Sequence, residues 1–577
     1  MGDKMVIGLL VGGIMDELSE DFSRGMFAES AHDDIDIIVI PVKYINREMK
    51  NIPDLYEYQY NESYQYITSA NIDVLVVAAD CIGCLTTNEN IISFMDKLKA
   101  KNVPILLAAS KIEGYPGVTF DNQSGIIEGF KYLVEKLGIK KICMLKTLET
   151  NSDINERYET FLKLMKEYDL EITENTVISA GPSYECREDC ARLLDVYPDV
   201  EAVICSNDYA ALGLYHVMKE RGLVPGRDIM VLGFDNSVKA SIITPTLTTI
   251  DANAKLLGNR LITVTRMLLE GWDLTNMTVP TQFILRDSFG LLMDNENTEE
   301  HILDKGYIDE YFERIFYKYN DESRKENFEL PILFKSIMNV IIDYIHDEVY
   351  NPERVTFLID KIREFFEKNG LKYTDSDTFI TYVERVKYVA LERFNNAERR
   401  CQAYETFSAI LKQIIKQSRA ADNEYEELKN LYQLSLKEMI EDTLDCYEYS
   451  EECYLNIILN LAEYGIQNAY IYLFEKPIYH VQDEPCEFPE YMNLKVAMTD
   501  GEISIPLEED QIILMDEIFN NPFITKDKLN MVLMPLYFRE SIYGCILYDL
   551  TDISYRIGDI LANYYSNAVR IIELLKN

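Results

Sequence analysis

Polar residues follow several of the apolar, strand-like segments in the first half of the chain. Asn207 and Asp208 come at the end of "EAVICS", Asp80 follows "IDVLVVAA", and Asp235 follows "DIMVLGF". In open α/β sheets, ligands bind beyond the carboxyl ends of the strands, where such residues gather. A carboxylate there makes charge-assisted hydrogen bonds to ligand hydroxyl groups. The sequence therefore predicts a small-molecule site at these strand ends.

Two interpretations compete for these residues. A polar side chain at a strand end often only caps the helix that follows, and we expect this role for Asp208, which would open a helix. Asn207 and Asp235 lie one step nearer to their strands, so we expect them to contact a ligand. Arg157, in "NERYETF", can face the same ligand as Asp235 across a cleft. The alternative is that Arg157 and Asp235 form only a salt bridge between two lobes.

The sequence lacks the motifs of common catalytic and metal sites. The glycines of "VGG" at 11–13 lack the rest of a nucleotide-binding fingerprint. Cys81 and Cys84 form a lone CxxC, which is either a redox or metal site or a turn after a strand; we favour the turn, because no second pair completes a site. We expect no enzymatic activity, no metal and no cofactor.

Composition limits the partners and the compartment. A chain of 577 residues exceeds one hydrophobic core, and its net charge of −42 repels a phosphate backbone, so direct DNA binding is disfavoured. The eleven scattered cysteines suit a reducing compartment. No apolar run reaches the ~18 residues of a membrane span, and acids follow the apolar N-terminal segment where a cleavage site would stand. We expect a cytoplasmic protein without membrane association.

The first half alternates apolar strands with amphipathic helices between residues 5 and 290. Continuous apolar strands that alternate with helices predict parallel sheets covered on both faces. Seven strand-like runs over this length favour two α/β lobes over one sheet.

A family resemblance rests on long matching segments. "VICSNDYAALGLYHVMKERGLVPGRDIMVLGFDN" followed by "TPTLTTI", together with "FDNQSGIIEGFKYLVEKLGIKKICML", "NERYETF" and "FILRDS", resembles the effector-binding domain of the LacI/GalR family. That domain is similar to periplasmic sugar-binding proteins. The resemblance covers residues 1–290 and implies a type I periplasmic-binding-protein-like α/β domain, whose two lobes are joined by three crossings. It also implies a small-molecule effector, a sugar or sugar derivative, in the cleft.

The resemblance implies a set of ligand contacts. Arg157 matches the effector-binding Arg of the family, Asn207 the Asn of its Asn-Asp pair, and Asp235 the acid after its Gly-aromatic pair. Tyr184 stands near the aromatic platform of the family. The expected ligand-binding residues are Met15, Asp16, Phe22, Asp80, Asp121, Ser124, Arg157, Tyr184, Asn207 and Asp235. The segment 46–66 is longer and richer in Tyr than the usual family connection.

The second half divides in two. Residues 291–440 begin with a linker and continue in helical patterning, with one or two long helices from about 376. These helices either pair between subunits or form a bundle within the chain. Residues 441–577 predict an α+β unit, and "MPLYFRESIYGCILYDL", with Pro535-Leu536 and Gly544, resembles the late strands of a GAF domain. The resemblance implies dimerisation and relay for this unit.

This order resembles the sensor part of multidomain bacterial regulators with GGDEF, AraC-type or kinase outputs. The leading hypothesis is an intracellular, homodimeric ligand-sensing protein that relays lobe closure to a separate output protein or to an output domain missing from this chain. One alternative is a LacI-type DNA-binding transcriptional regulator. Another is a dimeric scaffold that binds no ligand, and a third is an exported solute-binding protein.

Overall fold

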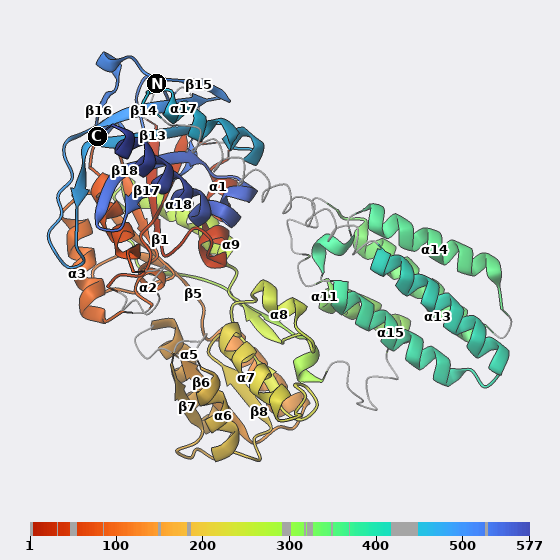
Figure 1. Cartoon of the computed structure of the whole chain (residues 1–577). Helices are drawn as coiled ribbons and strands as arrows, with labels where there is room; N and C mark the ends of the chain where they lie inside the picture. The colour runs from red at the N-terminus through yellow and green to blue at the C-terminus, as the bar shows by residue number, and fades with distance from the viewer. Residues whose placement is uncertain are drawn as a thin grey trace.

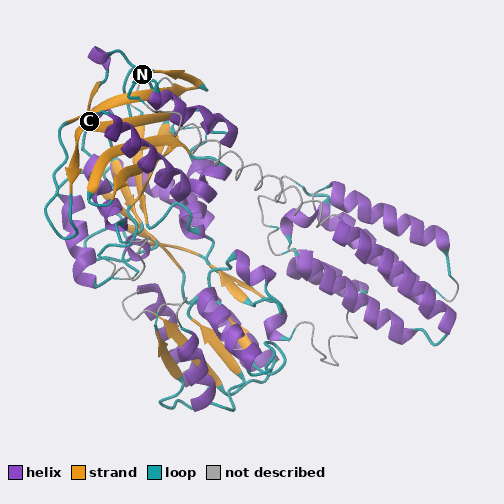
Figure 2. Ribbon diagram, viewed as in Figure 1, coloured by secondary structure: helices purple, strands orange, loops and turns teal. Residues whose placement is uncertain are grey.

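The computed structural model shows a two-lobed α/β part, a helical bundle and a C-terminal α+β unit (Figures 1 and 2). It describes residues 4–31, 33–46, 55–84, 86–147, 152–181, 186–290, 302–316, 319, 327–347, 350–368, 370–374, 376–416, 448–524 and 529–576.

The first lobe is built on parallel strands in the order β11-β5-β4-β3-β1-β2. They are β1 (Met5–Val11), β2 (Ile35–Pro41), β3 (Val74–Val77), β4 (Ile105–Ala108), β5 (Gly117–Phe120) and β11 (Met277–Val279). The helices are α1 (Glu17–Glu29), α2 (Ala79–Ile82), α3 (Asn88–Lys99) and α9 (Ala254–Leu269). Helices α1 and α9 touch at Gly25 and Gly258, where each added Cβ would lie within 2.3 Å of the other helix's backbone. Only glycine permits so close a crossing.

The second lobe has a parallel sheet in the order β7-β6-β8-β9 and a β10-β12 pair. The strands are β6 (Ile142–Thr147), β7 (Val177–Ala180), β8 (Ala202–Cys205), β9 (Met230–Leu232), β10 (Thr249–Asp251) and β12 (Gln282–Ile284). The helices are α4 (Ser124–Lys131) with its π-helical extension η3 (Tyr132–Lys136), α5 (Ser152–Glu167), α6 (Arg187–Val196), α7 (Asp208–Glu220) and α8 (Val238–Ile242), followed by a short 3-10 turn η4 (Asp287–Phe289). The chain passes between the lobes after β5, after β10 and after β11, as expected.

The helical bundle has its own apolar core. Its elements are η5 (Lys305–Tyr307), α11 (Ile308–Ile315), α13 (Leu330–His346), α14 (Pro352–Glu367), η6 (Gly370–Tyr373), α15 (Ser376–Arg393) and a helix over 397–416. The break after α15 comes where the Asn396 side chain accepts from the amide of Glu398 at 2.8 Å, which caps the next helix. The predicted long helical stretch is thus two helices as far as residue 416, and both contribute to the core of the chain's own bundle. Across the described segments, no helix has the length and apolarity to cross a membrane.

The C-terminal unit is an antiparallel sheet with helices on one face (Figure 1). Its strands are β13 (Ala469–Tyr479), β14 (Tyr491–Thr499), β15 (Glu502–Ser504), β16 (Ile512–Leu514), β17 (Asn530–Phe538) and β18 (Ser541–Asp549). Its helices are α17 (Cys453–Ile458), α18 (Asp552–Leu575) and the 3-10 turns η7 (Leu459–Tyr464), η8 (Glu508–Asp510) and η9 (Met515–Glu517). Helix α18 begins with a capping box, in which Thr551 and Ser554 each accept from the backbone N–H of the other.

The C-terminal unit and the first lobe share one sheet of twelve strands. Strand β17 pairs in parallel with β2, with Met531 opposite Ile38 and Val532 opposite Val39. The backbone N–H of Leu529 donates to the buried Asp36 carboxylate at 2.6 Å, which fixes the register at the start of the pairing. An exposed edge strand is an aggregation hazard, and here β17 covers the outer edge of β2.

The Tyr-rich segment 46–66 has a structural role at this junction. Its described part includes η2 (Glu57–Tyr66), which contacts the C-terminal unit. The Gln59 amide donates to the His480 carbonyl at 3.1 Å, and the Tyr66 hydroxyl donates to the Gly544 carbonyl at 2.8 Å. The extra length and the tyrosines of this segment therefore cover the shared sheet.

Asp36→Ala tests the junction. The change removes the acceptor of the Leu529 N–H, and a buried N–H without a partner costs about 1–3 kcal/mol. We expect the free energy of unfolding of the joined sheet to fall by this amount, measured by urea denaturation followed by circular dichroism. Asp34→Ala, at an exposed neighbouring position, is the matched control. An unchanged transition in Asp36→Ala would show that the register does not depend on this bond.

Candidate functional site

Arg157 of α5 is a buried cation that several contacts hold in place near the three crossings. Only 5% of its surface is exposed. Its Nε donates to the Asn122 side chain at 2.9 Å, and its Nη1 donates to the Ser206 carbonyl at the end of β8 at 2.7 Å. The guanidinium lies 3.4 Å from the centre of the Phe234 ring, an arrangement in which a cation and an aromatic face attract. These contacts fix the orientation of the guanidinium.

Asp235 faces this guanidinium. Its carboxylate lies 3.7 Å from Arg157 Nη1 and keeps 44% of its side-chain surface exposed. Its backbone φ angle is 105°, which is uncommon for a residue with a side chain, and the chain changes direction here after β9. Loss of water around the carboxylate raises the pKa of Asp235 to about 8; Arg157 opposes this rise, and the Asp208 carboxylate adds to it.

The Arg157–Asp235 pair belongs to one lobe. Helix α5 and strand β9 are both elements of the second lobe, so the expectation that this pair spans the two lobes is wrong. The family resemblance placed Arg157 in the helix that opens the second lobe, and the sequence placed Asp235 after a strand; the topology shows that this strand, β9, belongs to the same lobe.

The structure reverses the roles expected for Asn207 and Asp208. Asn207 has an extended backbone, and its side chain accepts from the Ala210 N–H at 2.9 Å, so Asn207 is the cap of α7. Asp208 is fully buried and accepts from the Thr249 hydroxyl at 2.5 Å and the Ser237 N–H at 2.7 Å. Burial raises the pKa of Asp208 to about 6. The start of a helix shifts by a residue or two without a change in sequence pattern, which is why these roles were exchanged.

Two of the residues expected in the first lobe come together in the loop after β1. Met15 is 46% exposed. Asp16 caps α1 by accepting from the Ser19 N–H at 3.2 Å, and burial raises its pKa. Phe22 lies elsewhere: it is fully buried and stacks on Phe120 with ring centres 6.3 Å apart, inside the core.

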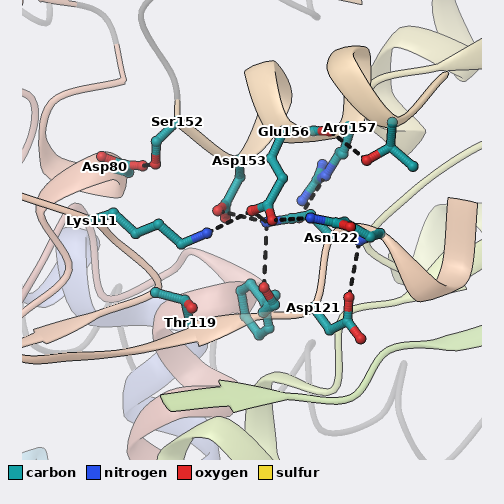
Figure 3. Close-up of polar contacts among 12 residues, drawn as sticks. Asp80, Lys111, Thr119, Asp121, Asn122, Ser152, Asp153, Glu156 and Arg157 are labelled. Carbon is teal, nitrogen blue, oxygen red and sulfur yellow. Dashed lines mark hydrogen bonds and ion pairs between the residues drawn. The ribbon is translucent and has the colours of Figure 1, made fainter. Parts of the chain in front are cut away.

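Asp80 joins the two lobes. The Ser152 hydroxyl, at the start of α5, donates to its carboxylate at 2.6 Å, and burial raises the pKa of Asp80 to about 6. Figure 3 shows this pair beside a second contact between the lobes, Lys111 to Glu156 at 2.6 Å. Contacts of this kind set the relative position of the lobes.

Asp121 and Ser124 lie at the first crossing. The Asp121 carboxylate accepts from the Ser124 N–H at 3.1 Å and from its hydroxyl, while the Thr281 hydroxyl donates to the Asp121 carbonyl at 2.9 Å. Thr281 belongs to the third crossing, so these bonds tie two crossings together. Tyr184 falls outside the described residues.

Tyr209 is a residue that the sequence interpretation did not single out. It follows Asp208 in the first turn of α7 and is 40% exposed. Burial raises its pKa, and carboxylates of both lobes add to the rise, Glu17 and Asp16 of the first lobe and Asp235 and Asp208 of the second. Lys239 Nζ lies 4.9 Å from the centre of the ring. In the sequence, the feature that could have pointed to Tyr209 is its position as an aromatic residue directly after the Asn207-Asp208 pair.

Burial raises the pKa values of Asp153 and Asp235, and Arg157 opposes the rise in both. Asp16 and Asp208, whose carboxyl groups add to the rise in Asp235, also have raised pKa values. No group of three or more potential metal ligands occurs among the residues that the structure describes. A raised pKa means that these carboxyl groups keep a proton to a higher pH than usual, so together with Arg157 they can both donate hydrogen bonds to ligand hydroxyl groups and accept hydrogen bonds from them.

Comparison with known proteins agrees with this fold. Residues 130–289 match the model of the periplasmic binding protein-like domain family. The HTH-type transcriptional repressor PurR of Pasteurella multocida is 34% identical over 138 residues, 23% of this chain and 40% of that protein. Catabolite control protein A of Priestia megaterium is 26% identical over 160 residues, 27% of this chain and 48% of that protein.

Solved structures of the same type include a LacI-family regulatory protein from Chloroflexus aggregans. It aligns with a TM-score of 0.40 at 21% identity, over 49% of this chain and 98% of its own. A complex of the transcriptional regulator CelR with cellobiose aligns with a TM-score of 0.41 at 18% identity, over 50% of this chain and 86% of its own.

The chain thus contains a periplasmic-binding-protein-like α/β domain, as the sequence predicted, and is similar over part of its length to PurR and catabolite control protein A. It spans less than half the length of PurR and catabolite control protein A. PurR is named an HTH-type transcriptional repressor, which favours the DNA-binding alternative over the leading hypothesis of a sensor that does not bind DNA.

Asp235→Asn tests the electrostatics of the site. The pKa of Asp235 is about 8 in the folded protein and about 3.9 when unfolded. Between about pH 3.9 and pH 8 the carboxyl group is therefore protonated in the folded state and ionised in the unfolded state. Its contribution to the free energy of unfolding falls as the pH rises through this range. Asparagine removes this dependence. We expect the melting temperature of Asp235→Asn, relative to wild type, to increase steadily from pH 5 to pH 8.

The exposed Asp273→Asn is the control for a general effect of lost charge. A melting-temperature difference that stays constant with pH in Asp235→Asn would contradict the assignment.

Proposed function

We propose that this protein regulates transcription in response to a small, uncharged polyhydroxyl metabolite, such as a sugar, bound between the two lobes. The observation that carries the proposal is the anchored Arg157 facing Asp235 at the carboxyl ends of β8 and β9. This pair lies within the segment that matches the periplasmic-binding-protein-like family model.

The site residues suit hydroxyl groups. Arg157 presents a fixed guanidinium, Asp235 an exposed acceptor, and Tyr209 a half-exposed aromatic ring. A sugar ring offers hydroxyls for the first two and an apolar face for the third. A ligand that contacts both Tyr209 and the Met15–Asp16 loop would prefer one arrangement of the lobes and shift their equilibrium toward it.

The relatives support transcription as the regulated process. PurR is named a transcriptional repressor, and it is 34% identical to this chain over 138 residues. A second candidate is a metabolite sensor that acts through a separate partner protein. The net charge of −42 favours this second function, because it opposes binding of these domains to a phosphate backbone.

Other features of the chain belong to the same proposal. We place the protein in the cytoplasm as a homodimer without catalytic activity. The resemblance of residues 441–577 to a GAF domain stays a prediction. The antiparallel strands and flanking helices of the C-terminal unit are compatible with it.

Calorimetric titration with D-ribose, D-glucose, cellobiose and D-glucose 6-phosphate tests ligand binding. We expect at least one neutral sugar to bind and the phosphate ester to bind more weakly than glucose. Tyr209→Ala should weaken binding about tenfold or more, since loss of an aromatic contact costs on the order of 1.4 kcal/mol. Tyr479→Ala, at a tyrosine that is 71% exposed on β13, is the matched control. Tight binding of the phosphate ester alone would contradict the proposed ligand class.

Recovery of bound DNA from a pool of genomic fragments, with and without the sugar, tests the transcriptional role. We expect sequence-specific fragments whose retention changes with the sugar and falls at high salt. Specific recovery of a partner protein with no enriched DNA would instead support the second candidate.

A further inference from the structure

The first two turns of α18 contact the loop that carries Met15 and Asp16. Tyr555, Gly558 and Asp559 have the spacing of one helix face. Each of the three meets the first lobe, and Gly558 also lies near the Tyr548 hydroxyl of the C-terminal unit to which α18 belongs.

Gly558 gives the closest approach. A Cβ added there would lie 2.8 Å from Ile14 Cγ2, so the helix leaves no room for a larger residue. Ile14 is 1% exposed and directly precedes Met15. The side chain of Ile14 therefore packs against α18, while the next residue, Met15, stays exposed.

Asp559 makes a mostly buried ion pair with Lys43, just after β2. The Lys43 Nζ lies 2.5 Å from the carboxylate, and the two side chains are 10% and 29% exposed. The same ammonium lies over the Tyr60 ring at 5.1 Å and would be 3.8 Å from a Cβ at Gly13. The ion pair between Lys43 and Asp559 therefore lies next to Gly13, at the N-terminal end of the loop.

Tyr555 holds the helix that follows the loop. Its hydroxyl lies 2.6 Å from the Ser23 hydroxyl in a buried hydrogen bond, and Arg24 lies 4.9 Å from the centre of its ring. Ser23 and Arg24 belong to α1, whose N-cap is Asp16. The loop and the helix after it are thus fixed at successive points by a single helix face.

We propose that α18 positions the Met15–Asp16 loop, so that the C-terminal unit forms part of the ligand-sensing module. Whatever moves α18 then changes ligand affinity, and ligand binding changes α18 to the same extent, because coupling between two sites is reciprocal. The inference rests on the proposed function only in assigning ligand contact to the loop. Tyr555, Gly558 and Asp559 are positioning residues that act through Ile14, Lys43 and Ser23.

Hydrogen–deuterium exchange of the full chain tests the positioning without a ligand. Asp559→Asn leaves Lys43 without its full ionic partner, and Gly558→Ala inserts a methyl group against Ile14. Alanine is the better helix former, so loosening in Gly558→Ala arises from the clash. We expect about tenfold faster exchange of the amides of residues 12–20 in both variants, because breaking buried contacts lowers the free energy of local opening.

Two controls separate positioning from general destabilisation. Ile560→Ala changes an adjacent residue of α18 that is 46% exposed. Leu494→Ala opens a cavity in β14 of the C-terminal unit and lowers its stability without touching the loop. Unchanged exchange in Asp559→Asn and Gly558→Ala, or an equal rise in Leu494→Ala, would overturn the proposal.

Calorimetry with D-ribose, D-glucose and cellobiose tests the functional consequence. Asp559→Asn should weaken binding of the sugar that the wild type binds, and Ile560→Ala should leave it unchanged; equal affinities in wild type and Asp559→Asn would overturn the role in sensing. If no sugar binds, the proposed ligand class fails, while the exchange experiment still decides whether α18 positions the loop.

Discussion

The parallel pairing of β2 with β17 is the constraint on which the rest of the structure depends. It joins strands almost five hundred residues apart, Ile37 with Asn530 among them, and turns two separate sheets into one. Two apolar clusters, one on each face, contain residues of both the first lobe and the C-terminal unit. The shared sheet and these clusters therefore join the first lobe and the C-terminal unit into one packed unit. The second lobe is attached to it through three crossings, and its residues Phe161 and Ile204 also belong to the first of the two clusters.

The electrostatics of the interlobe region depend on one guanidinium, that of Arg157, and on the carboxyl groups beside it. Arg157 is surrounded by carboxylates whose pKa values burial has raised, and its own hydrogen-bonding capacity is partly used by Asn122 and Ser206. Such a site holds its shape through the anchored cation. It leaves side-chain groups that can form hydrogen bonds with the hydroxyl groups of the ligand class that we propose.

The fold of the first half could be predicted because its signals are local. Strands buried on both faces, helices that end at glycine and a long family-like segment each specify one element. Arg157 and Asp235 were predicted as site residues from the same local segments, and Arg157 Nη1 lies 3.7 Å from the Asp235 carboxylate. Phe22 was expected at the ligand but stacks on Phe120, because a residue one turn into a helix faces the core or the ligand according to the helix's rotation.

By itself, the sequence determined the alternation of strands and helices, the residues at the strand ends, and the absence of a strongly basic character in this chain. Only the tertiary structure decided which of those residues meet. It placed Arg157 and Asp235 in the same lobe, made Asn207 the cap and Asp208 the buried acceptor, and brought α18 against Ile14. These outcomes depend on packing between segments that are distant in the chain. Local pattern has no access to such contacts, because the same strand-end motif serves as a cap or a ligand contact according to what packs against it.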